Sequence, residues 1–89
     1  MITVNFVDSV QKTFNGDSIV WVAGANIIDV IKELAEKYNL DPYSIANFRY
    51  VVNGKDIPQK KFAKIKLKPR DGIMIAPQGS GPIKGDDEI

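Results

Sequence analysis

Few residues of this chain could perform chemistry, because the sequence contains neither histidine nor cysteine. This composition excludes disulfides, zinc–thiolate sites and a cysteine nucleophile, and it removes the commonest general base and metal ligand. The most unusual stretch is instead Gly79-Ser80-Gly81, which follows a predicted apolar strand at 73–76 and the strand-stopping Pro77. A buried strand that continues into a segment with almost no side chains suggests a function at the tail. The alternative is an ordinary frayed C-terminus.

A second group of candidate residues is basic and lies between positions 55 and 70. Its members are Lys55, Lys60, Lys61, Lys64, Lys66, Lys68 and Arg70. One interpretation is a solvated face that keeps a sheet edge from pairing with other chains. The other is a docking patch for an acidic partner, or a weak site for a phosphate backbone, for which nearby aromatic residues could supply stacking. The side chains expected to contact such a partner are Lys60, Lys61, Lys64, Arg70, Phe48 and Tyr50.

The remaining polar and aromatic residues do not form a catalytic set. The carboxylates fall at predicted turns and helix caps, where each has a local structural use: Asp8, Asp17, Asp29 and Asp41. Trp21 is expected to pack in the core, although an exposed position would let it anchor a partner. The glycines are too scattered for a phosphate-binding loop. We therefore predict a protein that is not itself an enzyme and that binds no cofactor or metal.

The bulk properties of the chain limit its class. Its 89 residues predict one domain with one modest core. We expect a folded domain at 1–78 and a flexible, glycine-rich and acidic tail at 79–89. The net charge of +1, and the lack of any RNA-binding signature, do not favour a nucleic-acid partner. With no membrane span and no signal-peptide pattern, the expected location is the cytoplasm.

The first quarter of the chain reads as a pair of strands. Apolar residues alternate over 2–6, which is the period of a strand. The pattern is disturbed over 7–9, at a predicted bulge, and resumes over 10–14. Asn15-Gly16 is a strong signal for a tight hairpin turn, since both residues tolerate positive φ. Residues 19–22 make the return strand.

One amphipathic helix is predicted over residues 27–38. Apolar side chains recur there at helical spacing, and Asn26 is a suitable N-cap. Asn39 can end the helix in the left-handed conformation. The apolar stripe of this helix needs a sheet to pack against.

The C-terminal half supplies the remaining strands. Asp41-Pro42 can start a short helical turn, and residues 48–52 read as a third strand that ends at a tight Asn53-Gly54 turn. A very short extended piece follows around Ile57, and the last strand covers 73–76. The predicted fold is α+β: a β-grasp, or ubiquitin-like, fold with a mixed four- or five-stranded sheet and one main helix. In it the first and last strands are parallel neighbours at the centre.

Three segments of the sequence resemble motifs of one known family. Residues 51–58 read VVNGKDIP, similar to a VNG…VP hairpin, and residues 67–75 read LKPRDGIMI, similar to L-x-x-G-D-x-I-x-I. Ala76-Pro77 and the glycine-rich segment after it are similar to a PP-x-x-GG terminus. In this order, over residues 1–81, the segments resemble ThiS and MoaD, the sulfur carriers of thiamine and molybdopterin synthesis.

The resemblance implies a function in which the chain is the substrate of other proteins. Carriers of this family end in Gly-Gly, and an E1-like activating enzyme uses ATP to adenylate the terminal carboxylate, which becomes a thiocarboxylate. A synthase large subunit is the other implied partner. Glycine suits such a tail, because a residue without Cβ can follow a narrow tunnel in any conformation.

The sequence departs from the family pattern at its end. Gly79-Ser80-Gly81 stands where Gly-Gly is expected, and residues 82–89 follow it. Carriage of sulfur at Gly81 therefore requires removal of residues 82–89. The alternative is a non-catalytic interaction module, or a small subunit, that docks through its sheet face and the basic segment 55–70.

Overall fold

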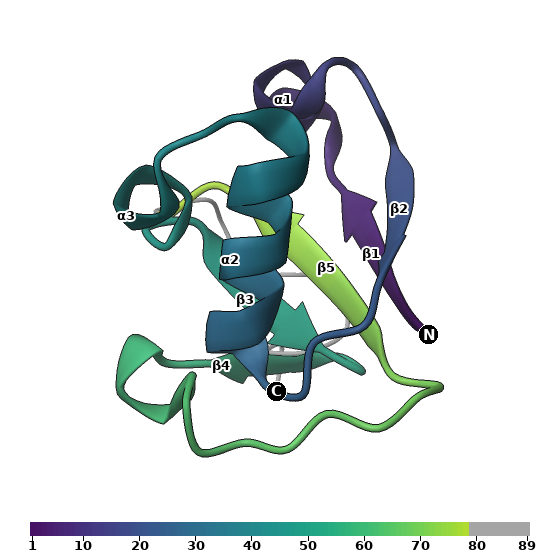
Figure 1. Cartoon of the computed structure of the whole chain (residues 1–89), viewed down its shortest axis with the longest axis vertical. Coiled ribbons are helices and arrows are strands. Elements are labelled where there is room, and N and C mark those ends of the chain that lie inside the picture. Colours follow the sequence, from purple (N-terminus) through teal and green to yellow (C-terminus); the bar gives the residue numbers. More distant parts are fainter. Residues whose placement is uncertain (79–89) are drawn as a thin grey trace.

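The structure is a computed structural model that describes residues 1–78. It contains a five-stranded mixed sheet with a long helix, α2, lying across one face (Figure 1). In chain order the elements are β1 (Ile2–Phe6), α1 (Asp8–Gln11), the 3-10 turn η1 (Lys12–Phe14), β2 (Ile19–Val22), α2 (Ile27–Tyr38), α3 (Pro42–Ile45), β3 (Arg49–Val52), β4 (Lys55–Ile57), the 3-10 turn η2 (Gln59–Lys61) and β5 (Gly72–Ala76).

The sheet has the order β2-β1-β5-β3-β4. Its two central neighbours, β1 and β5, run parallel, whereas the other neighbouring pairs are antiparallel. The predicted β-grasp fold is therefore confirmed, including the parallel pairing of the first and last strands. Because β5 is central, its position depends on strands from both ends of the sequence.

One face of the sheet forms the core together with α2. The register aligns buried side chains in rows across the strands, one of which contains Val20, Val4, Ile73 and Val52. The helix places a stripe of buried side chains on this face: Ile27, Val30, Ile31, Leu34 and Ala35. Burial of each such side chain contributes about 1.5–3 kcal/mol for the larger residues, so this layer dominates the stability of the domain.

The opposite side of the sheet, here called the open face, carries the alternate residues of the same strands. The row across it contains Ile19, Asn5, Met74, Val51 and Asp56. The described residues place no helix on this side (Figure 1). No helix of residues 1–78 therefore covers the open face, although Val51 at its centre is only 2% exposed.

The helix α2 begins and ends where the sequence predicts. The Asn26 side chain accepts a hydrogen bond from the Asp29 backbone N–H at 2.8 Å, and Asn39 adopts a left-handed φ of 55°. These caps satisfy backbone groups that the helix itself leaves unpaired. The short α3 also matches its prediction, because the Asp41 side chain accepts from the Tyr43 N–H and Pro42 is the first helical residue.

Residues 8–14 form helical turns, and the prediction that they continue the first strand is wrong. Val10 and Phe14 are both buried, and the Phe14 ring stacks on Phe6 with centroids 4.2 Å apart. A separation of four residues places two side chains on the same face of a strand or of a helix, so the pattern fits both. Asn15 and Gly16 have positive φ, as expected, but they follow η1 and do not form a tight hairpin.

The position of Trp21 also differs from the expectation. The side chain is 55% exposed on β2, an edge strand, and is not part of the core. In a four-residue strand that alternates buried and exposed residues, Val20 and Val22 take the core face and Trp21 takes the other. None of the helices within residues 1–78 is long and apolar enough to cross a membrane.

Candidate functional site

The candidate site is the end of β5, where the chain leaves the sheet towards the glycine-rich segment. β5 ends at Ala76, which pairs with Arg49 at the start of β3, and the described chain stops at Gln78. The predicted carrier residues Gly79, Ser80 and Gly81 lie outside the described residues. What the structure supplies is the place from which they begin, at one end of the two central strands.

A pocket of about 370 Å³ borders this end of β5. Gln78 lines it together with residues of β3, β4 and the turn after β4: Phe48, Arg49, Asp56, Ile57, Pro58, Gln59 and Phe62. The Arg49 Nε and one terminal guanidinium nitrogen both lie 2.8 Å from Asp56 Oδ2, and this ion pair crosses from β3 to β4. The pocket therefore has a polar wall near Gln78, the last described residue.

The start of β5 is fixed by a different set of contacts. Asn53 accepts a hydrogen bond from the Gly72 N–H at 3.0 Å through Oδ1, and its Nδ2 donates to Asp71 Oδ1 at 2.9 Å. The other carboxylate oxygen of Asp71 accepts from the Lys68 N–H at 2.8 Å. These hydrogen bonds, that from Lys68 foremost, hold the pKa of Asp71 below its usual range. The β3–β4 turn thus anchors the strand that carries the tail.

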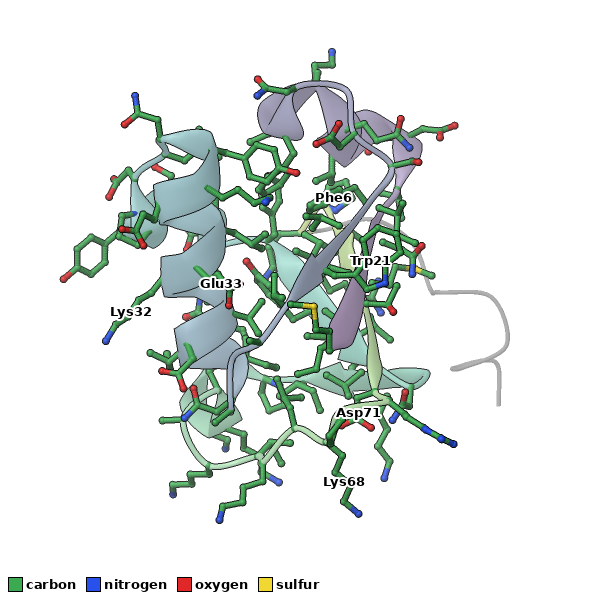
Figure 2. All side chains as sticks on the ribbon, turned by 45° about the vertical axis from the view of Figure 1, so that its right-hand side comes forward. Phe6, Trp21, Lys32, Glu33, Lys68 and Asp71 are labelled. Atoms are coloured by element: carbon green, nitrogen blue, oxygen red, sulfur yellow. The ribbon has the colours of Figure 1, made fainter. Side chains whose placement is uncertain are left out.

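The predicted basic residues do not all lie at the same end of β5. Lys60, Lys61, Lys64 and Arg70 are all exposed, as a docking patch requires. Arg70, however, precedes the start of β5, which is the end opposite to the tail, and Figure 2 shows its neighbours Lys68 and Asp71 together at that end. Lys60 and Lys61 belong to η2 and lie in the chain between Gln59 and Phe62, which both line the pocket at Gln78. Their role in binding a partner stays a prediction.

The two aromatic residues predicted to contact a partner differ in their surroundings. Phe48 is half-buried and lines the pocket that Gln78 also lines. Tyr50 is 0% exposed, its ring packs against Phe62, and its hydroxyl donates to the Ile45 carbonyl at 2.8 Å. Tyr50 is therefore a correction to the predicted set, because its side chain has no surface to offer a partner.

Sequence reasoning assigned no role to Ile19, the other large exposed side chain on β2. Ile19 is 40% exposed and lies on the open face together with Trp21. Figure 2 shows Trp21 on the side of the sheet away from the helix residue Lys32. The strict alternation over residues 19–22 could have indicated that Ile19 is exposed. In a strand Val20 and Val22 lie on one face, and Ile19 and Trp21 lie on the other.

Comparisons with solved structures give the same fold. A chain of the Amycolatopsis orientalis BexX/CysO complex superposes with a TM-score of 0.75 and 17% identity, over 91% of this chain and 99% of that one. Small archaeal modifier protein 1 of Methanosarcina acetivorans gives 0.72 and 23%, over 90% and 94%. CysO of Mycobacterium tuberculosis, described as an antigen, gives 0.73 and 17%, over 86% and 98%.

These likenesses extend over nearly the whole length of each neighbour, and their sequence identities are low. They show that the β-grasp fold of this chain is that of small ubiquitin-like proteins, in agreement with the resemblance read from the sequence. No protein-family model matches the sequence, and no curated protein matches it.

Proposed function

We propose that this protein is a small ubiquitin-like carrier, whose C-terminal carboxylate is activated and modified by partner proteins. The observation that supports this most directly is the course of β5, which lies at the centre of the sheet and leads at Gln78 into the segment Gly79-Ser80-Gly81. The neighbours named above include a modifier protein and a protein in complex with a partner. The protein acts through contacts with other proteins and has no catalysis of its own.

The proposed chemistry takes place on the carboxylate of Gly81, once residues 82–89 are removed. An E1-like enzyme transfers AMP from ATP to the carboxylate and releases pyrophosphate. Hydrosulfide (HS⁻) then attacks the acyl carbon, the bond to AMP breaks and AMP leaves, and the product is a thiocarboxylate. As in ThiS and MoaD, the thiocarboxylate supplies its sulfur to a reaction on a partner synthase's large subunit. The domain contributes a rigid end from which the glycine-rich segment can enter the partner's active site. The cytoplasm is the expected location.

The first test is the intact mass of the protein purified from its native cell. A species that ends at Gly81, and above all one in which sulfur replaces an oxygen, is the expected result. If the cellular protein keeps residues 82–89 and carries no modification, the carrier function is wrong.

A second test uses the activating enzyme encoded in the same cell. A chain that ends at Gly81 should support exchange of pyrophosphate into ATP, whereas chains that end at Ile89 or at Gln78 should not. The chain ending at Gln78 is the matched control, because it keeps all described elements and lacks the glycine-rich segment.

A second candidate function is a non-catalytic interaction module that docks through the sheet face and the basic segment 55–70. The exposure of Lys60, Lys61 and Lys64 favours it. Charge reversal at these three positions should abolish capture of the natural partner, while charge reversal at the exposed helix residues Lys32 and Lys37 should not. Deletion of residues 79–89 should leave the capture intact, and this result separates the module from the carrier.

A further inference from the structure

The charges of this chain are distributed unevenly along it. The segment 55–70 carries seven basic residues and a single carboxylate, that of Asp56, which pairs with Arg49 at 2.8 Å. The segment 82–89 has the opposite character, with one lysine and three carboxylates: Asp86, Asp87 and Glu88. Opposite net charges of this kind attract each other when the two segments can meet.

The fold gathers the lysines of the basic segment on one surface. Six of them are exposed and are here called the lysine surface: Lys55, Lys60, Lys61, Lys64, Lys66 and Lys68. The N–H groups of Lys64 and Ile65 donate to the Lys61 carbonyl at 3.0 and 3.1 Å, so successive turns hold η2 and the residues after it together. Lys55, Ile65 and Lys68 line one pocket of about 390 Å³. In Figure 1 the segment between β4 and β5 runs along the lower end of the domain.

Carboxylates within residues 1–78 do little to balance this surface. Arg49 and Asp56 form the one ion pair of the described residues, so none of the six lysines has an ion-pair partner there. Asp71 lies beside Lys68, but its carboxylate accepts hydrogen bonds from the Lys68 N–H and the Asn53 side chain. A group of carboxylates placed against the lysine surface would therefore meet an excess of positive charge.

The acidic segment begins close enough to reach this surface. Gln78 lines the same pocket as Gln59 and Phe62, and the two lysines of η2 lie between those residues in the chain. The carboxylates at 86–88 follow Gln78 by eight to ten positions. An extended chain spans about 3.3–3.6 Å per residue, so these carboxylates can lie up to about 26–36 Å from Gln78. The reach therefore extends well beyond η2.

We propose that the carboxylates of residues 86–88 occupy the lysine surface of their own chain. The segment 82–89 is then an internal ligand that competes with any acidic partner for this surface. Covalent linkage favours this occupant, because a short linker gives an effective concentration of about 1 mM. For a contact whose own dissociation constant is about 0.1–1 mM, such linkage weakens a competitor about two- to tenfold.

The contact connects the two ends of the proposed life of the chain. Cleavage after Gly81, which the carrier function requires, would release the acidic segment and expose the lysine surface in the same step. The contact itself does not depend on that function, because it needs only the charges of this chain.

The first experiment measures where the acidic segment lies. The chain has no cysteine, so Ile89→Cys gives a single thiol for a nitroxide spin label next to the carboxylates. In low salt the backbone amide NMR signals of residues 59–68 should broaden. The signals of α1, at the opposite end of the domain in Figure 1, should stay sharp. Addition of about 0.5 M NaCl should remove the broadening, because it shortens the screening length to about 4 Å.

Charge variants show whether the carboxylates and the lysines cause the broadening. Neutral amides at the three acidic positions (Asp86→Asn, Asp87→Asn and Glu88→Gln) should abolish it. Lys60→Gln combined with Lys61→Gln and Lys64→Gln should also abolish it. The matched control is Lys32→Gln combined with Lys37→Gln, at exposed positions of α2, which should leave the broadening unchanged.

A mixture of two chains distinguishes the internal contact from one between copies. One chain carries the spin label, and the other carries only ¹⁵N, so the ¹⁵N signals report on contacts between molecules. These signals should stay sharp. Broadening at residues 59–68 of the ¹⁵N chain would mean that a second copy supplies the carboxylates, and it would overturn the proposal.

Competition is measured with a fluorescent polyglutamate peptide as the acidic probe. The peptide should bind a chain that ends at Gly81 about two- to tenfold more tightly than the full chain. The full chain with the three amide substitutions should bind the peptide as the shortened chain does. Equal affinity for the full and shortened chains, or broadening that survives the amide substitutions, would overturn the proposal. No activating enzyme is involved, so such a failure would leave the carrier function untouched.

Discussion

The Asn53 side chain donates to the Asp71 carboxylate at 2.9 Å, across 18 positions of sequence. Asn53 belongs to the β3–β4 turn and Asp71 to the turn before β5, so this contact joins two of the three segments that resemble the sulfur-carrier family. The Asn53 N–H also donates to the Gly72 carbonyl at 2.9 Å. The two motifs are therefore joined by a set of hydrogen bonds among Asn53, Asp71 and Gly72, here called the Asn53–Asp71 clamp. This clamp fixes where β5 begins.

Removal of the Asp71 carboxylate should weaken this clamp. Asp71→Ala loses the hydrogen bonds from the Lys68 N–H and the Asn53 side chain. At about 0.5–1.5 kcal/mol for each of the two bonds, the free energy of unfolding should fall by about 1–3 kcal/mol. Urea denaturation measures the change, and Glu36→Ala, at an exposed position of α2, is the matched control that should leave the midpoint almost unchanged.

The same carboxylate should make the stability depend on acid pH. The pKa of Asp71 is lowered in the folded protein from an ordinary value of 3.8. Its stabilising effect is therefore complete above that value and is lost as the pH falls below it. Melting temperatures between pH 5 and pH 2 should decrease less steeply in Asp71→Asn than in the unchanged chain, over roughly the range of ordinary carboxyl pKa values. If the melting temperatures of the two proteins fell equally steeply with pH, Asp71 would not be a source of the acid dependence.

Tyr38 should control stability at alkaline pH. Burial and the hydrogen bond from its hydroxyl to Asp17 Oδ2, at 2.7 Å, raise the pKa of Tyr38 from 10.0 to about 12. The stabilisation is present below pH 10.0 and is lost as the pH rises towards about 12. Tyr38→Phe should lower the free energy of unfolding by about 1 kcal/mol at neutral pH.

The alkaline behaviour provides the control for this prediction. Above pH 10.0 the difference in free energy of unfolding between Tyr38→Phe and the unchanged chain should become smaller. The reason is that the folded protein disfavours the tyrosinate form of Tyr38. Tyr43→Phe, at a side chain that is 82% exposed, should have no effect at neutral pH. A Tyr38→Phe variant with unchanged stability would show that the bond to Asp17 contributes nothing.

A methyl group at Gly24 should be poorly tolerated. A Cβ there would lie 2.8 Å from the Val30 backbone nitrogen and 2.9 Å from the Asp29 Cβ, at the first turn of α2. Gly24→Ala should therefore cost about 1–3 kcal/mol of stability, as overpacking generally does. Gly72→Ala is the matched control, because its Cβ would meet only the Asn53 Oδ1, at 3.9 Å. Equal thermal stability of the two variants would refute the prediction.

The sequence by itself determined the elements whose signals are local. The helix over 27–38 follows from its period and caps, and the Asn53-Gly54 turn follows from residues that adopt positive φ, here 49° and 85°. These features depend on neighbours within a few positions, which the sequence displays directly. The parallel pairing of the first and last strands followed from the β-grasp arrangement as a whole, because period and turns alone do not dictate which strands are neighbours.

Only the tertiary structure decided three further matters. Val10 and Phe14 fit a strand or a helix by spacing, and the choice depends on packing against Phe6. The burial of Tyr50 and the exposure of Trp21 depend on which strand lies at the edge and which face α2 covers. The separation of Arg70 from Gln78 depends on the direction of β5, which runs between them. Each is a relation between segments distant in sequence, which local patterns do not contain.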